Sequence, residues 1–115
     1  MAQAVLRVEG LPEAPLHAAA AYYARYLPEA RRALEGAEAL VLIFSPADHS
    51  HRAWRLAAVQ ELAREAAPAR VNALVGDDDA GLAEAGAFLA AAPGVTGQIL
   101  AVDGKYAGNR YGGGR

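Results

Sequence analysis

An unbroken apolar run, Leu-Val-Leu-Ile-Phe, occupies residues Leu40 to Phe44. A strand without polar positions must be covered on both of its faces, which is typical of the parallel sheets of α/β proteins. Three other β-like runs lie at Ala4 to Val8, Arg70 to Val75 and Gln98 to Val102. The four runs predict the strands of one small sheet.

Helix-forming segments alternate with these strands. The first spans Leu16 to Leu34, and Pro28 is expected to kink or restart it. The second follows a turn ending at Asp48 and continues to about Ala67, and the third runs from the Asp77 region to about Ala91. This alternation predicts right-handed crossovers, and therefore an α/β three-layer sandwich with a short parallel sheet of about four strands, β-α-β-α-β-α-β.

Composition limits the classes of function. The net charge of −2 gives no broad positive field, which argues against nucleic-acid binding by the body of the domain. Apolar residues make up 54% of the chain. Many are alanines, which contribute little buried area each, so part of the apolar surface is expected to meet a partner.

Localisation and domain limits follow from the same composition. The chain has no cysteine and no signal-like start, which indicates a cytoplasmic protein. The longest charge-free stretch, Ala85 to Val102, is interrupted by glycine and proline, so no transmembrane segment is predicted. We expect one domain over residues 1–104 and a glycine-rich tail or arm over residues 105–115.

Two segments resemble the short-chain dehydrogenase/reductase family. They are Glu65 to Leu74 and Val95 to Gly104, and the second, Val-Thr-Gly-Gln-Ile-Leu-Ala-Val-Asp-Gly, is similar to the family's last strand. Working backwards, Leu40 to Phe44 resembles the strand that ordinarily carries a catalytic serine, and Val5 to Gly10 resembles the strand before it. The resemblance implies a truncated Rossmann-like fold that corresponds to the family's C-terminal half only.

The chain departs from the family where the chemistry is done. The family's Tyr-x-x-x-Lys pair would fall on Asp48 and Arg52, although Ser45 could match the family serine. Asp48 is expected to be ionised and Arg52 to stay protonated, so neither replaces its counterpart. The chain also lacks a Gly-rich turn between an early strand and a helix. The resemblance therefore implies a degenerate, non-catalytic member with no NAD or NADP cofactor bound by a single subunit.

Other interpretations of the same strand ends stay open. If the protein is an enzyme whose cleft is completed by another subunit, the candidate residues are Ser45, Asp48, His49 and His51. A small-molecule-binding module would use the same strand ends. His49 and His51 are also weak candidates for metal ligands, although no third ligand is apparent and a helix start with exposed histidines is the favoured interpretation.

Three further features have structural and functional interpretations. For Asp77 to Asp79 we favour a helix cap over a site for a hard cation. Tyr22, Tyr23 and Tyr26 are expected to pack in the core or a groove rather than to line a ligand. Asn109 to Arg115 resembles a short RNA-binding tail, but a terminal arm is the favoured interpretation.

Association is the function these observations favour. The strand at Ala4 to Val8 would present an unpaired edge, because its usual neighbour in the family belongs to the first half. We therefore expect an interaction or scaffold protein, either a homo-oligomer or an accessory subunit of a full-length reductase. The pathway and any ligand are left open by the sequence.

Overall fold

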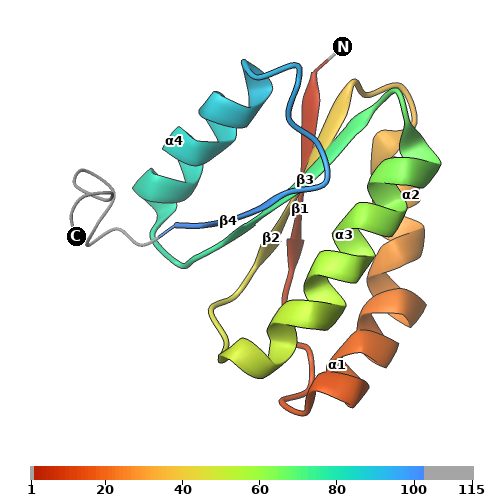
Figure 1. Cartoon of the computed structure of the whole chain (residues 1–115), viewed down its shortest axis with the longest axis vertical. Helices are drawn as coiled ribbons and strands as arrows, with labels where there is room; N and C mark the ends of the chain where they lie inside the picture. The colour runs from red at the N-terminus through yellow and green to blue at the C-terminus, as the bar shows by residue number, and fades with distance from the viewer. Residues whose placement is uncertain (1, 103–115) are drawn as a thin grey trace.

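A computed structural model describes residues 2–102, which form one sheet of four parallel strands in the order β1-β2-β3-β4 (Figure 1). The elements in chain order are β1 (Gln3–Val8), α1 (Pro15–Ala21), the π-helical turn η1 (Tyr22–Tyr26), α2 (Leu27–Leu34), β2 (Ala39–Phe44), the 3-10 turn η2 (His49–His51), α3 (Arg52–Ala66), β3 (Arg70–Val75), α4 (Asp79–Ala90) and β4 (Ile99–Ala101).

The helices cover the sheet from both sides. Figure 1 shows α1, α2 and α3 on one side of the sheet and α4 on the other. The α/β three-layer sandwich with a parallel sheet of four strands is thereby confirmed, and it is consistent with a truncated Rossmann-like fold. Every residue of β2 is buried, as its unbroken apolar run predicted.

Two apolar clusters form the core, one on each side of the sheet. The larger joins Leu40, Leu42 and Phe44 of β2 to the α1–α3 layer, where Tyr22 and Leu62 are buried. The smaller cluster lies beneath α4 and consists of Val41, Ile43, Leu74, Leu82 and Leu89. Alternate side chains of β2 therefore fill opposite layers, as the two-residue period of a strand requires.

The first helical segment is interrupted near Pro28, as expected from the sequence. The break lies at η1, just before Pro28, where the Leu27 N–H donates to the Tyr22 carbonyl five residues earlier. A proline ring clashes with the carbonyl of the residue four positions before it. The wide turn accommodates Pro28 in the first turn of α2, where its missing N–H costs no helical bond.

The helix termini follow local sequence signals. The Asp78 carboxylate accepts from the Gly81 N–H at 2.7 Å, so the predicted acidic cap of α4 is confirmed. At the other end of α4, Arg70 donates to the carbonyls of Leu89 at 2.9 Å and Ala92 at 3.1 Å. Because Arg70 is the first residue of β3, its two bonds fix the C-terminal end of α4 to that strand.

The fourth strand is shorter than expected and ends beside a glycine. Strand β4 covers Ile99–Ala101, within the predicted Gln98 to Val102. The Val102 N–H still donates to the Val75 carbonyl at 2.7 Å. A Cβ added at Gly76 would lie 2.3 Å from the Val102 carbonyl oxygen, so only glycine permits this approach of the two strand ends.

Two further sequence expectations concern a membrane-spanning segment and the glycine-rich end of the sequence. In the part of the chain that the structure describes, no helix is long and apolar enough to cross a membrane. The glycine-rich segment expected at residues 105–115, including Asn109 to Arg115, lies outside the described residues. The expected boundary near residue 104 therefore stays a prediction.

Strand β1 lies at one edge of the sheet and is only partly covered. Val5 is 57% exposed, although it belongs to the central part of the strand. Two side chains connect β1 to α4, because Gln3 donates to the Gly86 carbonyl at 3.0 Å and Arg7 lies 3.5 Å from the Asp79 carboxylate. Between these contacts a groove of about 350 Å³ separates α4 from β1.

Candidate functional site

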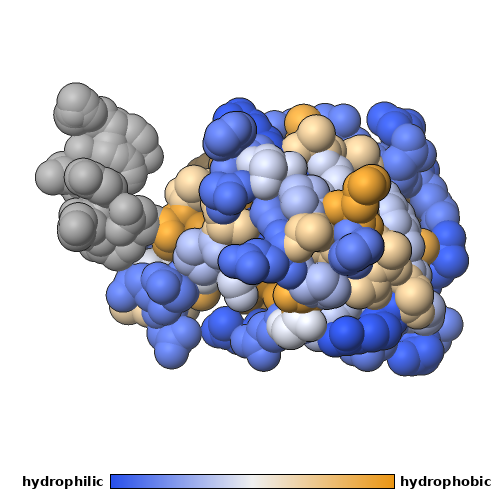
Figure 2. Space-filling view, turned by 90° about the horizontal axis from the view of Figure 1, so that it is seen from below, coloured by the Kyte–Doolittle hydropathy of each residue, from blue (hydrophilic) through white to orange (hydrophobic). Residues whose placement is uncertain are grey.

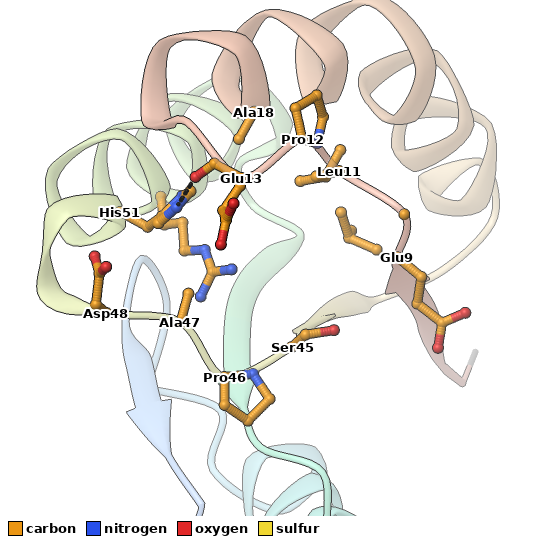
Figure 3. A pocket seen from close by; sticks show the side chains of 13 residues that line it. Glu9, Leu11, Pro12, Glu13, Ala18, Ser45, Pro46, Ala47, Asp48 and His51 are labelled. Carbon is orange, nitrogen blue, oxygen red and sulfur yellow. Dashed lines mark hydrogen bonds between the residues drawn. The ribbon is translucent and has the colours of Figure 1, made fainter.

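A polar hollow lies where β1 and β2 end. We call it the β1–β2 hollow; it has a volume of about 290 Å³ and is lined mainly by the segments that follow the two strands, residues 8–13 and 45–48, together with His51 and Arg55 (Figure 3). The carboxyl ends of parallel strands are the usual position for ligands in open α/β sheets. Figure 2 views this end of the molecule and shows hydrophobic residues scattered among hydrophilic ones.

A tyrosine fixes the end of β1 at the rim of this hollow. The Tyr26 hydroxyl donates to the Glu9 carbonyl at 2.5 Å and accepts from the Glu9 N–H at 3.2 Å. Both backbone groups of Glu9 are thus satisfied by one side chain from the helical layer. The position of the following loop is therefore set by the π-helical turn that carries Tyr26.

Asp48 has a local structural role. Its carboxylate accepts from the Ser50 N–H at 2.9 Å and from the Ser50 hydroxyl, which caps the 3-10 turn at the start of α3. These hydrogen bonds from Ser50 lower the pKa of the Asp48 carboxyl, since they stabilise its ionised form. Asp48 is therefore the N-cap of this turn.

His51 is buried and uses both of its ring nitrogens. The Trp54 indole N–H donates to His51 Nδ1 at 3.0 Å, and His51 Nε2 lies 2.9 Å from the Glu13 carbonyl oxygen, the bond drawn in Figure 3. An indole nitrogen only donates and a carbonyl only accepts, so the network assigns a neutral ring with its proton on Nε2. His51 joins the start of α3 to the loop after β1.

Arg55 is the least expected residue of the site. Only 8% of its surface is exposed, and its Nε atom is buried without a hydrogen-bond partner. The guanidinium carbon lies 4.7 Å from the centroid of the Phe44 ring and 5.9 Å from that of Trp54. Within residues 2–102, no carboxylate lies at ion-pair distance from it. Burial lowers the pKa of the Arg55 guanidinium.

A second hollow adjoins the first. We call it the α3–β4 hollow; it has a volume of about 480 Å³ and lies beside α3, next to the ends of β3 and β4. The two hollows share Ala47, Asp48, His51 and Arg55, so these residues form the wall between them. Arg52 and His49 line only the α3–β4 hollow, whereas Ser45 lines only the β1–β2 hollow.

The structure brings some of the predicted site residues together. Ser45, Asp48 and His51 line one hollow, whereas His49 lies on the far side of the shared wall. The expectation that both histidines are exposed is wrong for His51, because Trp54 and the Glu13 carbonyl draw its ring into the protein. The metal interpretation has little support, since both His51 nitrogens are already hydrogen-bonded.

The positions of the family's catalytic pair are occupied by residues with other contacts. Asp48 caps a turn, and Arg52 is exposed at the first position of α3. The family's tyrosine phenol and lysine ammonium group therefore have no counterpart at these two positions, as the sequence indicated. Ser45 is exposed at the end of β2 and lacks an adjacent imidazole with a free nitrogen in the described part of the chain.

The sequence did contain a signal for Arg55. The buried residues of α3 are Arg55, Ala58, Val59, Leu62 and Ala63, which recur at helical spacing. The spacing of these residues predicts that position 55 is buried, yet the residue there is a charged arginine. Such conflicts are expected at functional sites.

Comparisons with known proteins agree with the resemblance. The family model described as "SDR-like: Short chain dehydrogenase-like protein" matches residues 6–102. No curated protein and no solved structure gives a significant match. The matched range covers all of the strands except the first few residues of β1, and all of the helices. The chain therefore belongs to the SDR-like family of short chain dehydrogenase-like proteins.

Proposed function

We propose that this chain is a non-catalytic interaction protein of the cytoplasm, which assembles with a second copy of itself through the free edge of β1. The observation that carries the proposal is the state of β1 within residues 2–102. The strand pairs with β2 on one side only, and its central residue Val5 is 57% exposed. An unpaired strand of this kind is a template for a further strand.

The unpaired backbone groups of β1 belong to three residues. The Glu38 N–H donates to the Ala2 carbonyl at 3.3 Å, so even-numbered residues of β1 direct their polar groups towards β2. Successive residues of a strand direct these groups to opposite sides. Gln3, Val5 and Arg7 therefore direct theirs to the free edge.

A two-fold axis through Val5 pairs these groups completely. In an antiparallel arrangement of two β1 strands, Val5 then faces the partner's Val5, and Gln3 faces the partner's Arg7. Each outward residue meets an outward residue, which gives the hydrogen-bonded type of pair with about 5.5 Å between Cα atoms. A shift of the axis to Arg7 would place like charges opposite each other, which is destabilising. Charge thus disfavours the register centred on Arg7, whereas the register centred on Val5 pairs all three residues.

The absence of catalysis in this proposal rests on residue chemistry. Asp48 and Arg52 replace a tyrosine and a lysine, and His51 has no free nitrogen to accept a proton from Ser45. The competing proposal is an oxidoreductase or a small-molecule-binding module whose cleft another subunit completes. The oxidoreductase alternative would need a proton acceptor from that subunit.

Site-directed crosslinking tests the register directly. The natural chain has no cysteine, so a single Val5→Cys substitution creates one thiol. A Cα separation of about 5.5 Å suits a disulfide, and we expect rapid oxidation to a disulfide-linked dimer. Tyr23→Cys is the matched control, because Tyr23 is exposed on the helical layer. Faster crosslinking through position 23 than through position 5 would move the interface to the helices and contradict the proposal.

The oligomeric state supplies a second test. We expect a mass near twice 11.9 kDa by light scattering at high protein concentration. Val5→Pro removes an edge N–H without removing a bond to β2, so this variant should fold and stay monomeric. Val5→Ala retains the N–H and should still dimerise. A natural chain that is monomeric at several hundred micromolar would refute self-association and leave a full-length reductase as the partner to test.

A further inference from the structure

Arg55 has an unmet need for hydrogen-bond acceptors. A guanidinium group carries five N–H donors and stays charged at physiological pH. Its two aromatic neighbours, Phe44 and Trp54, attract the positive charge through the faces of their rings. They offer no hydrogen-bond acceptor in the plane of the guanidinium group, where its N–H groups point. In the part of the chain described, Arg55 has neither an ion pair nor a hydrogen bond to a protein oxygen.

The missing acceptor has a route to the guanidinium. Arg55 lines the β1–β2 hollow, whose volume of about 290 Å³ corresponds to roughly ten water molecules in the liquid. Buried charges in proteins are normally paired or hydrogen-bonded. The hollow is therefore large enough for a small molecule that brings the acceptor with it.

The charge of the other lining residues limits the ligand. Glu9, Glu13 and Asp48 line the same hollow. Figure 3 shows the Glu9 side chain directed away from the centre, whereas the Glu13 carboxylate points into the hollow. The Asp48 carboxylate is already engaged by Ser50. A dianion such as phosphate would be repelled by Glu13 and Asp48, and a monoanion would be repelled less.

We propose that Arg55 anchors a binding site for a small monocarboxylate in the β1–β2 hollow. The two carboxylate oxygens accept from guanidinium N–H groups in the planar, two-pronged geometry that arginine and carboxylate share. The hydroxyl of Ser45, which lines the same hollow, is a second donor available to an oxygen of the ligand. The rest of the ligand lies against Leu11, Pro12 and Ala18.

The test uses the intact chain and a series of simple probes. Acetate, propionate, butyrate and benzoate are titrated into isotope-labelled protein in a carboxylate-free and phosphate-free buffer, and amide shifts are followed by NMR. Propionamide is the neutral control for propionate. We expect saturable shifts at the ends of β1 and β2 and at the start of α3 with the carboxylates, and at least tenfold weaker binding of the amide.

Five variants assign the binding to Arg55. Arg55→Met and Arg55→Gln should each weaken carboxylate binding at least tenfold, and Arg55→Lys should weaken it less. Arg52→Met is the matched control, because Arg52 is exposed in the neighbouring hollow, and it should change the affinity less than twofold. Glu13→Gln should strengthen binding, since it removes a negative charge that faces the ligand.

Three results would overturn the proposal. The first is the lack of a saturable shift with any carboxylate up to 100 mM. The second is equal binding by the natural chain and both neutral Arg55 variants, which would place the anion elsewhere. The third is tighter binding of inorganic phosphate than of the carboxylates, which would replace the proposed ligand class. The β1 variant Val5→Pro should bind the probes normally, so failure of self-association would not be mistaken for failure of this site.

Discussion

Replacement of Arg55 by methionine should make the protein more stable. The arginine is 8% exposed and has no ion-pair partner within residues 2–102. A buried charge without a partner costs about 3–5 kcal/mol. The contacts with Phe44 and Trp54 offset roughly 1 kcal/mol each. The balance is a net gain of about 2 kcal/mol in the free energy of unfolding for Arg55→Met, whose apolar side chain reaches the position of the arginine Nε and leaves the rest of the space open to the β1–β2 hollow.

Urea denaturation measures this difference. With a slope of about 1.5 kcal/mol per molar urea, a gain of 2 kcal/mol moves the midpoint up by roughly 1.3 M. The corresponding rise in Tm is about 8 °C for a domain of this size. Both proteins must be compared at one concentration, because self-association would make the apparent stability depend on concentration.

Matched controls separate burial from charge. Arg52→Met removes the same charge from an exposed position and should change stability by less than about 0.5 kcal/mol. Saturating carboxylate should narrow the gap between the natural chain and Arg55→Met, because it stabilises only the form that binds it. If Arg55→Met is instead less stable than the natural chain by more than about 0.5 kcal/mol, the stacked guanidinium is a net stabilising group and the reasoning is refuted.

Three further substitutions test the surroundings of the site. The Tyr22 hydroxyl is buried without a partner, and burial raises the pKa of Tyr22 to about 12. Because this value exceeds that of the unfolded chain, about 3 kcal/mol of stability is present below pH 10 and lost as the pH rises to about 12. Tyr22→Phe should not lose this stability at high pH, and at pH 7 it should be at least as stable as the natural chain. Urea midpoints measured at pH 7 and at about pH 12 will show both effects. Asp48→Asn should remove part of the loss of stability in acid. The ionised Asp48 carboxylate stabilises the fold at pH values above the ordinary pKa of an aspartate, and this contribution is lost as the pH falls through the lowered pKa of Asp48 in the folded protein. Acid titrations followed by circular dichroism compare the two proteins. His51→Ala leaves the Trp54 indole N–H and the Glu13 carbonyl unpaired and should cost roughly 1–3 kcal/mol, and tryptophan fluorescence during unfolding reports it.

The architecture could be predicted from the sequence because its signals are local. The apolar run at Leu40 to Phe44 needs cover on both faces, and the structure buries every residue of β2. The cap at Asp78 depends on a backbone N–H three residues away. Such features need no knowledge of the rest of the chain. The same holds for the end of the first helical segment, Leu34, which sequence and structure share.

The site was harder to predict because its contacts join distant segments. His51 is buried by a carbonyl at position 13, 38 residues earlier in the chain. Arg55 stacks on Phe44, the last residue of another element. The pattern of α3 identifies Arg55 as a residue of the buried stripe. Only the tertiary structure shows that no carboxylate of the described residues forms an ion pair with Arg55.

The two proposals concern different parts of β1, namely its free edge and the segment at its carboxyl end. Gln3, Val5 and Arg7 alternate with the residues that face the helical core, and Gln3 and Arg7 reach α4 on the other side. Val8 and Glu9 continue the same strand into the wall of the β1–β2 hollow. Tyr26 holds both backbone groups of Glu9 in place. The carboxyl end of β1 is therefore held in place within one chain, whether or not a second copy pairs with the edge of the strand. For this reason we expect ligand binding at Arg55 to be independent of dimer formation.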